Sequence, residues 1–339
     1  MTDSTPLSEK LASLTPKQLA KLRSRLQQSP QRMVFPRAKV TDIPEGVRVY
    51  IDGREAWRAT SSQARLWFLE QYLGPNPTYN VVRSIRLVGT LNLDALHAAF
   101  QHLIQRHEAL RTTFHPIDGV LYQTIAASQE CDWHVIDLQT VPEGDLESTF
   151  QECLKEWGRQ PFDLTRDCLL RVRVFCLSQR QFGLQVVIHH IVSDGWTFGI
   201  LAEELSALYR AFLSGQDASP LPSPTLQFAD YSLWLYEQLE SGKRDRNRQY
   251  WQTQLGGDLP TLDLPCDRPR GSEQTFNGRR TAIHFSRAET DALNTLARRS
   301  GASLFMVLLA SFTVLLYRHT HQTDIIIGTP IANRDRPEL

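Results

Sequence analysis

Residues 181–195 read QFGLQVVIHHIVSDG, a stretch in which an apolar run ends in two adjacent histidines and is followed by an aspartate and a glycine. The apolar and β-branched residues predict a strand over 181–190, then a turn, then a helix that begins at Thr197. Because side chains alternate between the two faces of a strand, His189 and His190 point in opposite directions. The two histidines are therefore expected to have different roles.

His190 lies at the predicted exit of the strand and is the candidate catalytic residue, since imidazole takes up and returns a proton near neutral pH. His189 is expected to be a positioning or packing residue. Asp194 can cap the following helix, orient an imidazole or pair with a distant arginine. Gly195 suits a tight turn or the close approach of a ligand to the backbone. The residues alone also fit an ordinary strand–turn–helix with two histidines at its rim.

Further segments surround the HHxxxDG stretch in a fixed order. They are Ser62–Gln71 (SQARLWFLEQ) with Tyr79-Asn80, Arg106–Phe114 (RHEALRTTF), Pro161–Leu164 with Leu169–Arg171, Phe228–Trp234, Tyr250-Trp251, Leu264–Arg270, Gln274–Gly278 and Ile327–Arg334. With these segments the chain resembles the condensation domains of non-ribosomal peptide synthetases from about Thr60 to its C-terminus. Heterocyclisation domains carry aspartates in place of the two histidines, and the opening segment is more similar to domains that accept an L-configured or unepimerised donor.

The resemblance implies an α/β, chloramphenicol acetyltransferase-like fold, in which two sandwich lobes enclose a tunnel. It implies amide bond formation between an acyl or peptidyl thioester on one carrier protein and the amine of an aminoacyl group on a second. No cofactor is bound by such a domain itself, since the substrates arrive on the phosphopantetheine arms of peptidyl or acyl carrier proteins.

The same resemblance suggests roles for individual residues. His190 accepts the amine proton or holds the amine in line, and Gly195 offers its amide to the thioester oxygen or serves the turn. Asp194 forms a structural salt bridge with Arg334, with Arg280 as the second choice, or only caps its helix. The candidates for the tunnel wall are Arg65, Trp67, Tyr79, Ser193 and Trp196.

The alternation of patterns divides the chain into four parts. Residues 1–30 form a helical docking-like segment for the C-terminus of an upstream synthetase or synthase, or a frayed leader. Residues 31–55 form a linker with a short edge strand at 47–51, 56–220 the N-terminal lobe, and 221–339 a partial C-terminal lobe. Strands are expected at 82–87, 168–177, 280–285 and 324–328, and helices at 93–107, 197–213, 226–241, 245–254 and 304–318, the last of them buried.

Family members continue past Arg334 with the rest of the second lobe, so we expect this chain, which ends at Leu339, to be truncated. Two alternatives stay open at this point. One is a non-catalytic module that docks or binds carrier proteins, and the other is a related HHxxxDG acyltransferase that takes a donor from free coenzyme A.

Composition excludes several classes of function. Lys plus Arg and Asp plus Glu number 37 each, and this balance gives no electrostatic case for nucleic acid or a membrane surface as partner. No apolar run reaches the ~20 residues of a membrane span, and the N-terminus lacks a signal pattern. Five cysteines without CxxC spacing predict free thiols in the cytoplasm. Arg106-His107-Glu108 lacks HExxH spacing, so no metal site is expected.

Overall fold

The computed structural model describes residues 46–216, 219–239, 242, 244–268, 278 and 281–331, and the strands of this part form two sheets. The strands are β1 (Arg48–Ile51), β2 (Arg54–Arg58), β3 (Asn80–Val88), β4 (Thr112–Ile117), β5 (Val120–Ile125), β6 (Asp132–Asp137), β7 (Leu170–Ser178) and β8 (Gln181–His189). The helices are α3 (Ser61–Leu73), α4 (Leu93–Arg106), α5 (Glu143–Gly158), α6 (Thr197–Leu213), α7 (Phe228–Gln238), α8 (Arg244–Gln254), α9 (Arg287–Arg299) and α10 (Leu304–Thr320), with 3-10 turns η2 (Glu108–Arg111) and η3 (His190–Val192). The expected mixed α/β architecture is confirmed.

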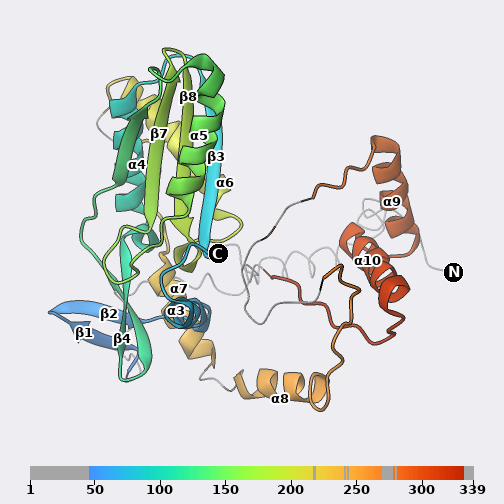
Figure 1. The fold of residues 1–339 in the computed structure, drawn as a ribbon. Coiled ribbons are helices and arrows are strands. Elements are labelled where there is room, and N and C mark those ends of the chain that lie inside the picture. The colour runs from blue at the N-terminus through green and yellow to red at the C-terminus, as the bar shows by residue number, and fades with distance from the viewer. Residues whose placement is uncertain are drawn as a thin grey trace, which may run out of the picture.

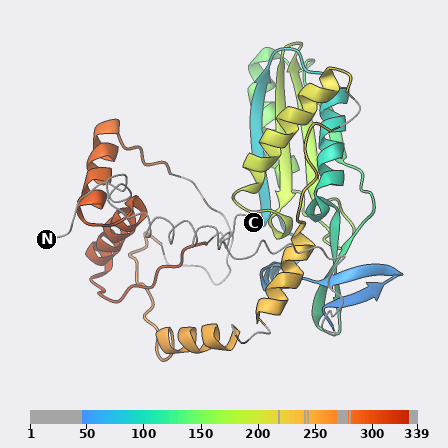
Figure 2. The same ribbon diagram turned by 180° about the vertical axis from the view of Figure 1, so that it is seen from behind.

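One sheet has helices on both faces. Its strand order is β3-β8-β7-β6, antiparallel except for the parallel pair β6–β7. α4 and α6 cover one face and α5 covers the other (Figures 1 and 2). β7 is therefore buried along its length up to Cys176 and Leu177, which explains its continuous apolar run.

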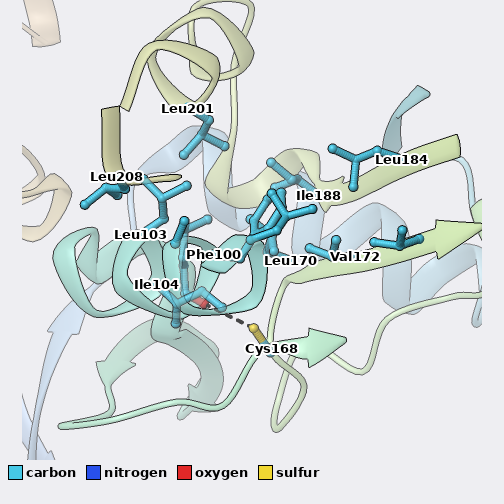
Figure 3. Close-up of a cluster of buried hydrophobic side chains, with 14 of the residues drawn as sticks. Phe100, Leu103, Ile104, Cys168, Leu170, Val172, Leu184, Ile188, Leu201 and Leu208 are labelled. Carbon is cyan, nitrogen blue, oxygen red and sulfur yellow. Dashed lines mark hydrogen bonds between the residues drawn. The ribbon is translucent and has the colours of Figure 1, made fainter. Parts of the chain in front are cut away.

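The largest buried cluster lies between this sheet, α4 and α6 (Figure 3). Phe100 and Leu103 of α4 meet Leu170 and Ile188 of the sheet and Leu208 of α6, and all five side chains are at most 1% exposed. Full burial of such a side chain stabilises the fold by about 1.5–3 kcal/mol. The apolar residues whose spacing predicted α4 and α6 thus form the faces that pack against the sheet. The predicted limits of both helices are confirmed to within one residue.

On the face of the sheet that α5 covers, the packing depends on a glycine, Gly183. Phe150 of α5 packs edge-to-face against Phe175 of β7, with ring centroids 5.3 Å apart and planes at 74°. A Cβ added at Gly183 of β8 would lie 2.4 Å from the Phe150 ring, so only glycine leaves room for this contact. α5 therefore sits close to the strand that leads to the two histidines.

The other sheet has the antiparallel order β1-β2-β5-β4. β1 and β2 are joined by Asp52 and Gly53, which both have positive φ, as a two-residue hairpin turn of type I′ requires. The expected edge strand at 47–51 is confirmed as β1. The β1–β2 hairpin includes residue 56, at which the N-terminal lobe was expected to begin. Trp57 of β2 packs in one cluster with Leu233 of α7.

Three of the helices in the C-terminal part, α7, α8 and α10, start within two residues of the predicted positions, whereas α9 was not predicted. Ser303 caps α10 by accepting a hydrogen bond from the backbone N–H of Met306 at 3.2 Å, and the helix runs to Thr320. α10 packs against α9, and in both views the two helices stand apart from the sheets (Figures 1 and 2). No single helix among the described residues has the length and hydropathy of a membrane span, although α9 and α10 together, bent by 101°, do.

Three predictions for this part are wrong. α10 is not buried, because among the described elements it packs mainly on α9, and Phe305, Phe312 and Leu315 are about half exposed. The described residues 281–285 and 324–328 form no strand. A strand exists only when a neighbour satisfies its backbone groups, and no described strand pairs with either segment.

The docking-like segment 1–30, and the linker up to residue 45, lie outside the described residues, as do Arg280 and Arg334. The three boundaries between the four parts therefore stay predictions.

Candidate active site

The predicted catalytic stretch begins where β8 leaves the sheet. The strand ends at His189, one residue earlier than predicted, because His190 begins the turn η3. The backbone N–H of His189 donates to the carbonyl of Leu169 at 3.1 Å, and that of His190 donates to the carbonyl of Tyr79 at 2.8 Å. Chain segments on both sides of β8 thus hold the start of the turn.

The His190 ring is exposed and has a defined orientation. Its Nδ1 lies 2.7 Å from the carbonyl oxygen of Ser193. A carbonyl oxygen only accepts hydrogen bonds, so Nδ1 carries the proton and the neutral ring has its lone pair on Nε2. The Ser193 hydroxyl donates to the His189 carbonyl at 3.2 Å and closes the turn. This arrangement leaves the basic nitrogen of His190 available to a substrate.

His189 is buried with an exposed fraction of 0%. Its Nδ1 accepts a hydrogen bond from the backbone N–H of Ile191 at 3.1 Å. The edges of the Phe162 and Tyr79 rings contact its imidazole, with centroids 5.9 and 6.3 Å away. The two histidines therefore face in different directions, one into the packed interior and one out of it.

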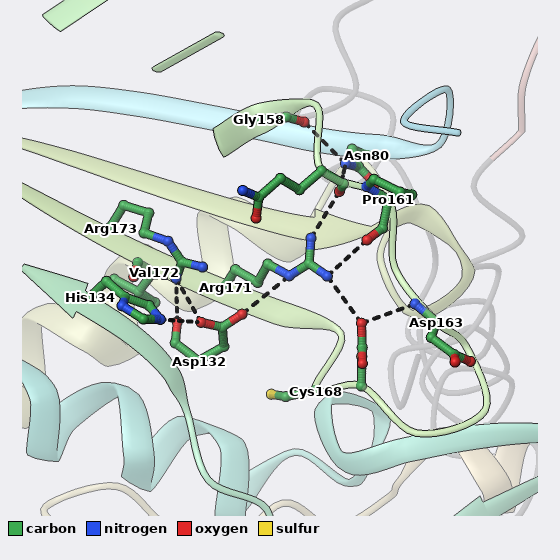
Figure 4. Close-up of polar contacts among 12 residues, drawn as sticks. Asn80, Asp132, His134, Gly158, Pro161, Asp163, Cys168, Arg171, Val172 and Arg173 are labelled. Carbon is green, nitrogen blue, oxygen red and sulfur yellow. Dashed lines mark hydrogen bonds and ion pairs between the residues drawn. The ribbon is translucent and has the colours of Figure 1, made fainter. Parts of the chain in front are cut away.

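Arg171, a buried arginine of β7, holds the segment that leads to Phe162, and it shares Asp132 with the buried Arg173 (Figure 4). Arg171 donates to the carbonyls of residues 160 and 161 at 2.8 and 2.9 Å, and its guanidinium carbon lies 3.8 Å from the Phe162 ring centroid. Asp132 bridges Arg171 at 3.2 Å and Arg173 at 2.8 Å. Since Phe162 contacts His189, this network supports the histidine from the side of α5.

Asp194, two residues before the N-cap residue Trp196, satisfies backbone N–H groups at the start of the helix that follows the turn. Its Oδ1 accepts hydrogen bonds from the backbone N–H of Trp196 at 3.1 Å and of Thr197 at 3.0 Å, and from the Thr197 hydroxyl at 2.9 Å. The capping interpretation thus has a geometric basis. The alternative salt bridge with Arg334, or with Arg280, stays a prediction because both arginines lie outside the described residues.

Gly195 does not have a positive φ, and a Cβ built on it meets nothing within 4 Å. The turn itself therefore does not require glycine. Open space therefore lies beside this backbone, five residues after the exposed His190.

Comparison with known proteins identifies the family. The family model described as Condensation domain matches residues 54–339. The chain belongs to the condensation domain family. A linear gramicidin synthase protein of Brevibacillus parabrevis is 39% identical over 288 residues, which make up 85% of this chain and 6% of that protein. Phosphinothricin tripeptide synthetase PhsC of Streptomyces viridochromogenes is 36% identical over 336 residues, 98% of this chain and 30% of that one. The condensation domain thus spans a small part of these longer relatives.

Solved structures agree with this assignment. The X-domain from teicoplanin biosynthesis superposes with a TM-score of 0.68 at 28% identity, over 84% of this chain and 60% of that chain. A four-domain nonribosomal peptide synthetase bound to AMP and glycine gives a TM-score of 0.68 at 21% identity, over 88% and 22%, and so bears on the fold alone. The condensation domain has the chloramphenicol acetyltransferase-like α/β fold that the sequence predicted.

The five tunnel candidates of the condensation domain have different surroundings. Ser193 belongs to the turn, and Tyr79, just before β3, accepts the His190 N–H through its carbonyl. Trp196 is 55% exposed just after the turn, and Trp67 packs in the cluster that includes Ile191. Arg65 lies on the exposed side of α3. Two hollows elsewhere, one lined by residues of α4 and β6 and one by residues of α9 and α10, include none of the five. A tunnel past His190 therefore stays a prediction.

Arg106 and His107 join two helices of the domain. Glu204 of α6 bridges the Arg106 Nε at 3.0 Å and the His107 Nε2 at 2.5 Å. Burial, followed by the nearby Arg106 guanidinium, lowers the pKa of His102. Arg106, His107 and Glu204 thus link α4 to α6. The described part of the chain contains no group of three or more His, Cys, Asp or Glu side chains that could hold a metal ion.

Sequence reasoning assigned no role to Glu70 or Phe162, although both contact the His189 ring or its surroundings. Phe162 was recognised only as part of the Pro161–Leu164 segment. Glu70 follows the apolar run of α3, where an acidic residue is expected on the surface. The structure reverses that pattern: Gln63 and Glu70, seven residues apart on one face, are buried, while Phe68 and Tyr72 are exposed. The burial of Gln63 and Glu70 depends on what packs against α3, which the sequence of the helix alone does not show.

Proposed function

We propose that this condensation domain catalyses amide bond formation between a carrier-bound acyl or peptidyl thioester and the amine of a carrier-bound aminoacyl acceptor. The family, and relatives that are peptide synthetases, support this class of reaction. The observation that carries the proposal is the orientation of His190, whose Nδ1–H donates to the Ser193 carbonyl and whose Nε2 is left as a base. An exposed imidazole in this tautomer is equipped to receive a proton from an amine.

In the proposed step the acceptor amine attacks the thioester carbonyl carbon, a C–N bond forms and the C–S bond breaks. The amine proton passes to Nε2 of His190 and then to the departing sulfur, which leaves as the thiol of the phosphopantetheine arm. A thioester is already activated, so alignment of the two arms supplies much of the acceleration, up to about 7–11 kcal/mol in well-oriented systems.

The space beside Gly195 supports the same reaction. The acceptor and thioester must both approach the exposed His190, and the backbone of Gly195 lies in the same turn with open space where a side chain would stand. A backbone N–H in that position is suited to stabilise the oxyanion that forms on the thioester carbonyl. Asp194 holds this stretch against the start of α6 through its cap.

The proposed partners are an upstream and a downstream carrier protein, each presenting one substrate on a phosphopantetheine arm. We also propose that residues 1–30 receive the C-terminus of an upstream synthetase or synthase. The much greater length of the relatives is consistent with a domain that works between carriers of one assembly line.

A second candidate is a non-catalytic binding module. One solved neighbour, at 28% identity, is a complex of the X-domain and OxyB from teicoplanin biosynthesis, so a related domain is known in complex with another protein. A module of this kind binds its partner without forming an amide.

The two functions, and an acyltransferase that uses free coenzyme A, are separated by one transfer assay. The donor is supplied either on a carrier protein or on coenzyme A, the acceptor on a second carrier protein, and the amide product is measured by mass spectrometry. We predict product from the carrier-bound donor and at least tenfold less from the coenzyme A donor. Equal rates from both donors contradict the proposal, as does carrier binding with no product.

A further inference from the structure

A buried acidic residue faces the histidine that supports the active-site turn. Glu70 of α3 is 4% exposed, and neither of its carboxylate oxygens has a hydrogen-bond partner among the described residues. Its Oε2 lies 3.9 Å from Nε2 of His189, which is also buried and also without a hydrogen-bond partner there. Two unpaired polar groups thus face each other in the packed interior, where leaving either of them unpaired is costly.

The proton positions on His189 follow from its other contacts. Nδ1 accepts the backbone N–H of Ile191 at 3.1 Å and so carries no proton. The neutral ring then has its proton on Nε2, the atom that faces Glu70. The rings of Phe162 and Tyr79 hold the imidazole at its sides. The one remaining donor of His189 therefore lies 3.9 Å from a Glu70 carboxylate oxygen that is able to accept it.

Packing alone does not call for a carboxylate at this position. Methionine fills a similar volume in an apolar environment and has no charge to desolvate. α3 packs against η3, so a side chain at position 70 reaches the turn in either case. What glutamate adds is an acceptor for the Nε2–H.

We propose that Glu70 is a positioning residue that accepts the Nε2–H of His189 and thereby fixes the turn that orients His190, an inference whose activity readout rests on the proposed function. The 3.9 Å separation is about 1 Å longer than an N–H···O hydrogen bond, and such bonds at active sites tighten when substrate binds.

A short series of contacts leads from Glu70 to the base. The Glu70 carboxylate lies 3.9 Å from Nε2 of His189, and Nδ1 of that ring accepts the N–H of Ile191 at 3.1 Å. The carbonyl of His189 accepts the hydroxyl of Ser193, and the carbonyl of Ser193 accepts Nδ1–H of His190. A His189 ring that turns therefore releases the turn at Ile191 and loosens the hold on His190.

Kinetics of matched variants test the role. Glu70→Gln keeps a carbonyl acceptor, whereas Glu70→Met removes it and keeps the volume. In the amide-forming assay we expect Glu70→Met to lower kcat by about 10- to 100-fold, as loss of an outer-shell partner does, with little change in KM, while Glu70→Gln retains most of the activity. Glu152→Met, at an exposed position of α5, is the control and should match the wild type.

A spectroscopic readout separates this inference from the proposed function. Ring ¹⁵N chemical shifts of labelled histidine in the 339-residue chain report which nitrogen carries the proton, whether or not an amide is formed. We expect Nε2–H for His189 and Nδ1–H for His190 in the wild type and in Glu70→Gln, and a mixture of tautomers in Glu70→Met. If the wild type shows these shifts but forms no amide, the proposed function is refuted and the positioning role of Glu70 stands.

A double-mutant cycle guards against a variant that is merely destabilised. If Glu70 acts through His189, Glu70→Met causes no further loss of kcat in a His189→Phe background. Should Glu70→Met not fold, Glu70→Asp, whose shorter side chain withdraws the carboxylate, takes its place and should show the same loss of tautomer preference. The inference is overturned if Glu70→Met has the ring shifts and kcat of the wild type. It is also overturned if Glu70→Met lowers kcat equally in the wild-type and His189→Phe backgrounds.

Discussion

At the scale of single residues, two substitutions of Asp194 distinguish a capping role from an ion-pairing role. Its Oδ1 accepts from the backbone N–H groups of Trp196 and Thr197, so Asp194→Ala should lower the free energy of unfolding by about 1 kcal/mol. Asp194→Asn keeps an acceptor oxygen and should stay within about 0.5 kcal/mol of the wild type in urea denaturation. An asparagine variant as unstable as the alanine variant would contradict the cap and favour the predicted salt bridge with Arg334.

The two histidines and Glu70 show which residue-level features a sequence reveals. His189 is buried and His190 exposed, in agreement with the different directions that the sequence predicted, although His190 lies in the turn η3 and not on the strand. Glu70 was missed because its partner is distant in sequence and lies in another element. The tautomer of His190 also needed coordinates, since it depends on the Ser193 carbonyl across the turn.

At the scale of elements, the contact of α5 with β8 depends on Gly183. A Cβ there meets the Phe150 ring at 2.4 Å, so Gly183→Ala should lower the free energy of unfolding by about 1–3 kcal/mol through overpacking. The matched control is Gly199→Ala in α6, where a Cβ meets nothing within 4 Å. That change should leave stability unaltered or raise it by up to about 1 kcal/mol. Equal unfolding midpoints for the two variants would refute the close contact.

Helices were predicted better than strands, and the difference is physical. α4 and α6 satisfy their own backbone groups, and their apolar spacing shows which face packs, so their limits were predicted to within a residue. The segments 280–285 and 324–328 have strand-like composition, but a strand is defined by its neighbour, which no local pattern contains. The exposure of α10 was missed for the same reason, because burial depends on what covers a helix.

At the scale of the whole molecule, family and fold were predictable because many short segments occur in one order along the chain. Their agreement identified a condensation domain before any contact was known, and the match over residues 54–339 confirmed it. The relatives are far longer, so carriers and neighbouring domains supply the substrates in the proposed function. In that function this chain contributes a turn that presents one imidazole to both substrates.

The most direct test of the role of His190 is single-turnover amide formation by His190→Ala, followed with carrier-bound donor and acceptor. We predict a rate at least ~10²-fold below the wild type, the usual cost of losing a general base, with carrier binding unchanged. His97→Ala, at an exposed position of α4, should behave like the wild type. Turnover by His190→Ala close to the wild-type rate would contradict a catalytic His190.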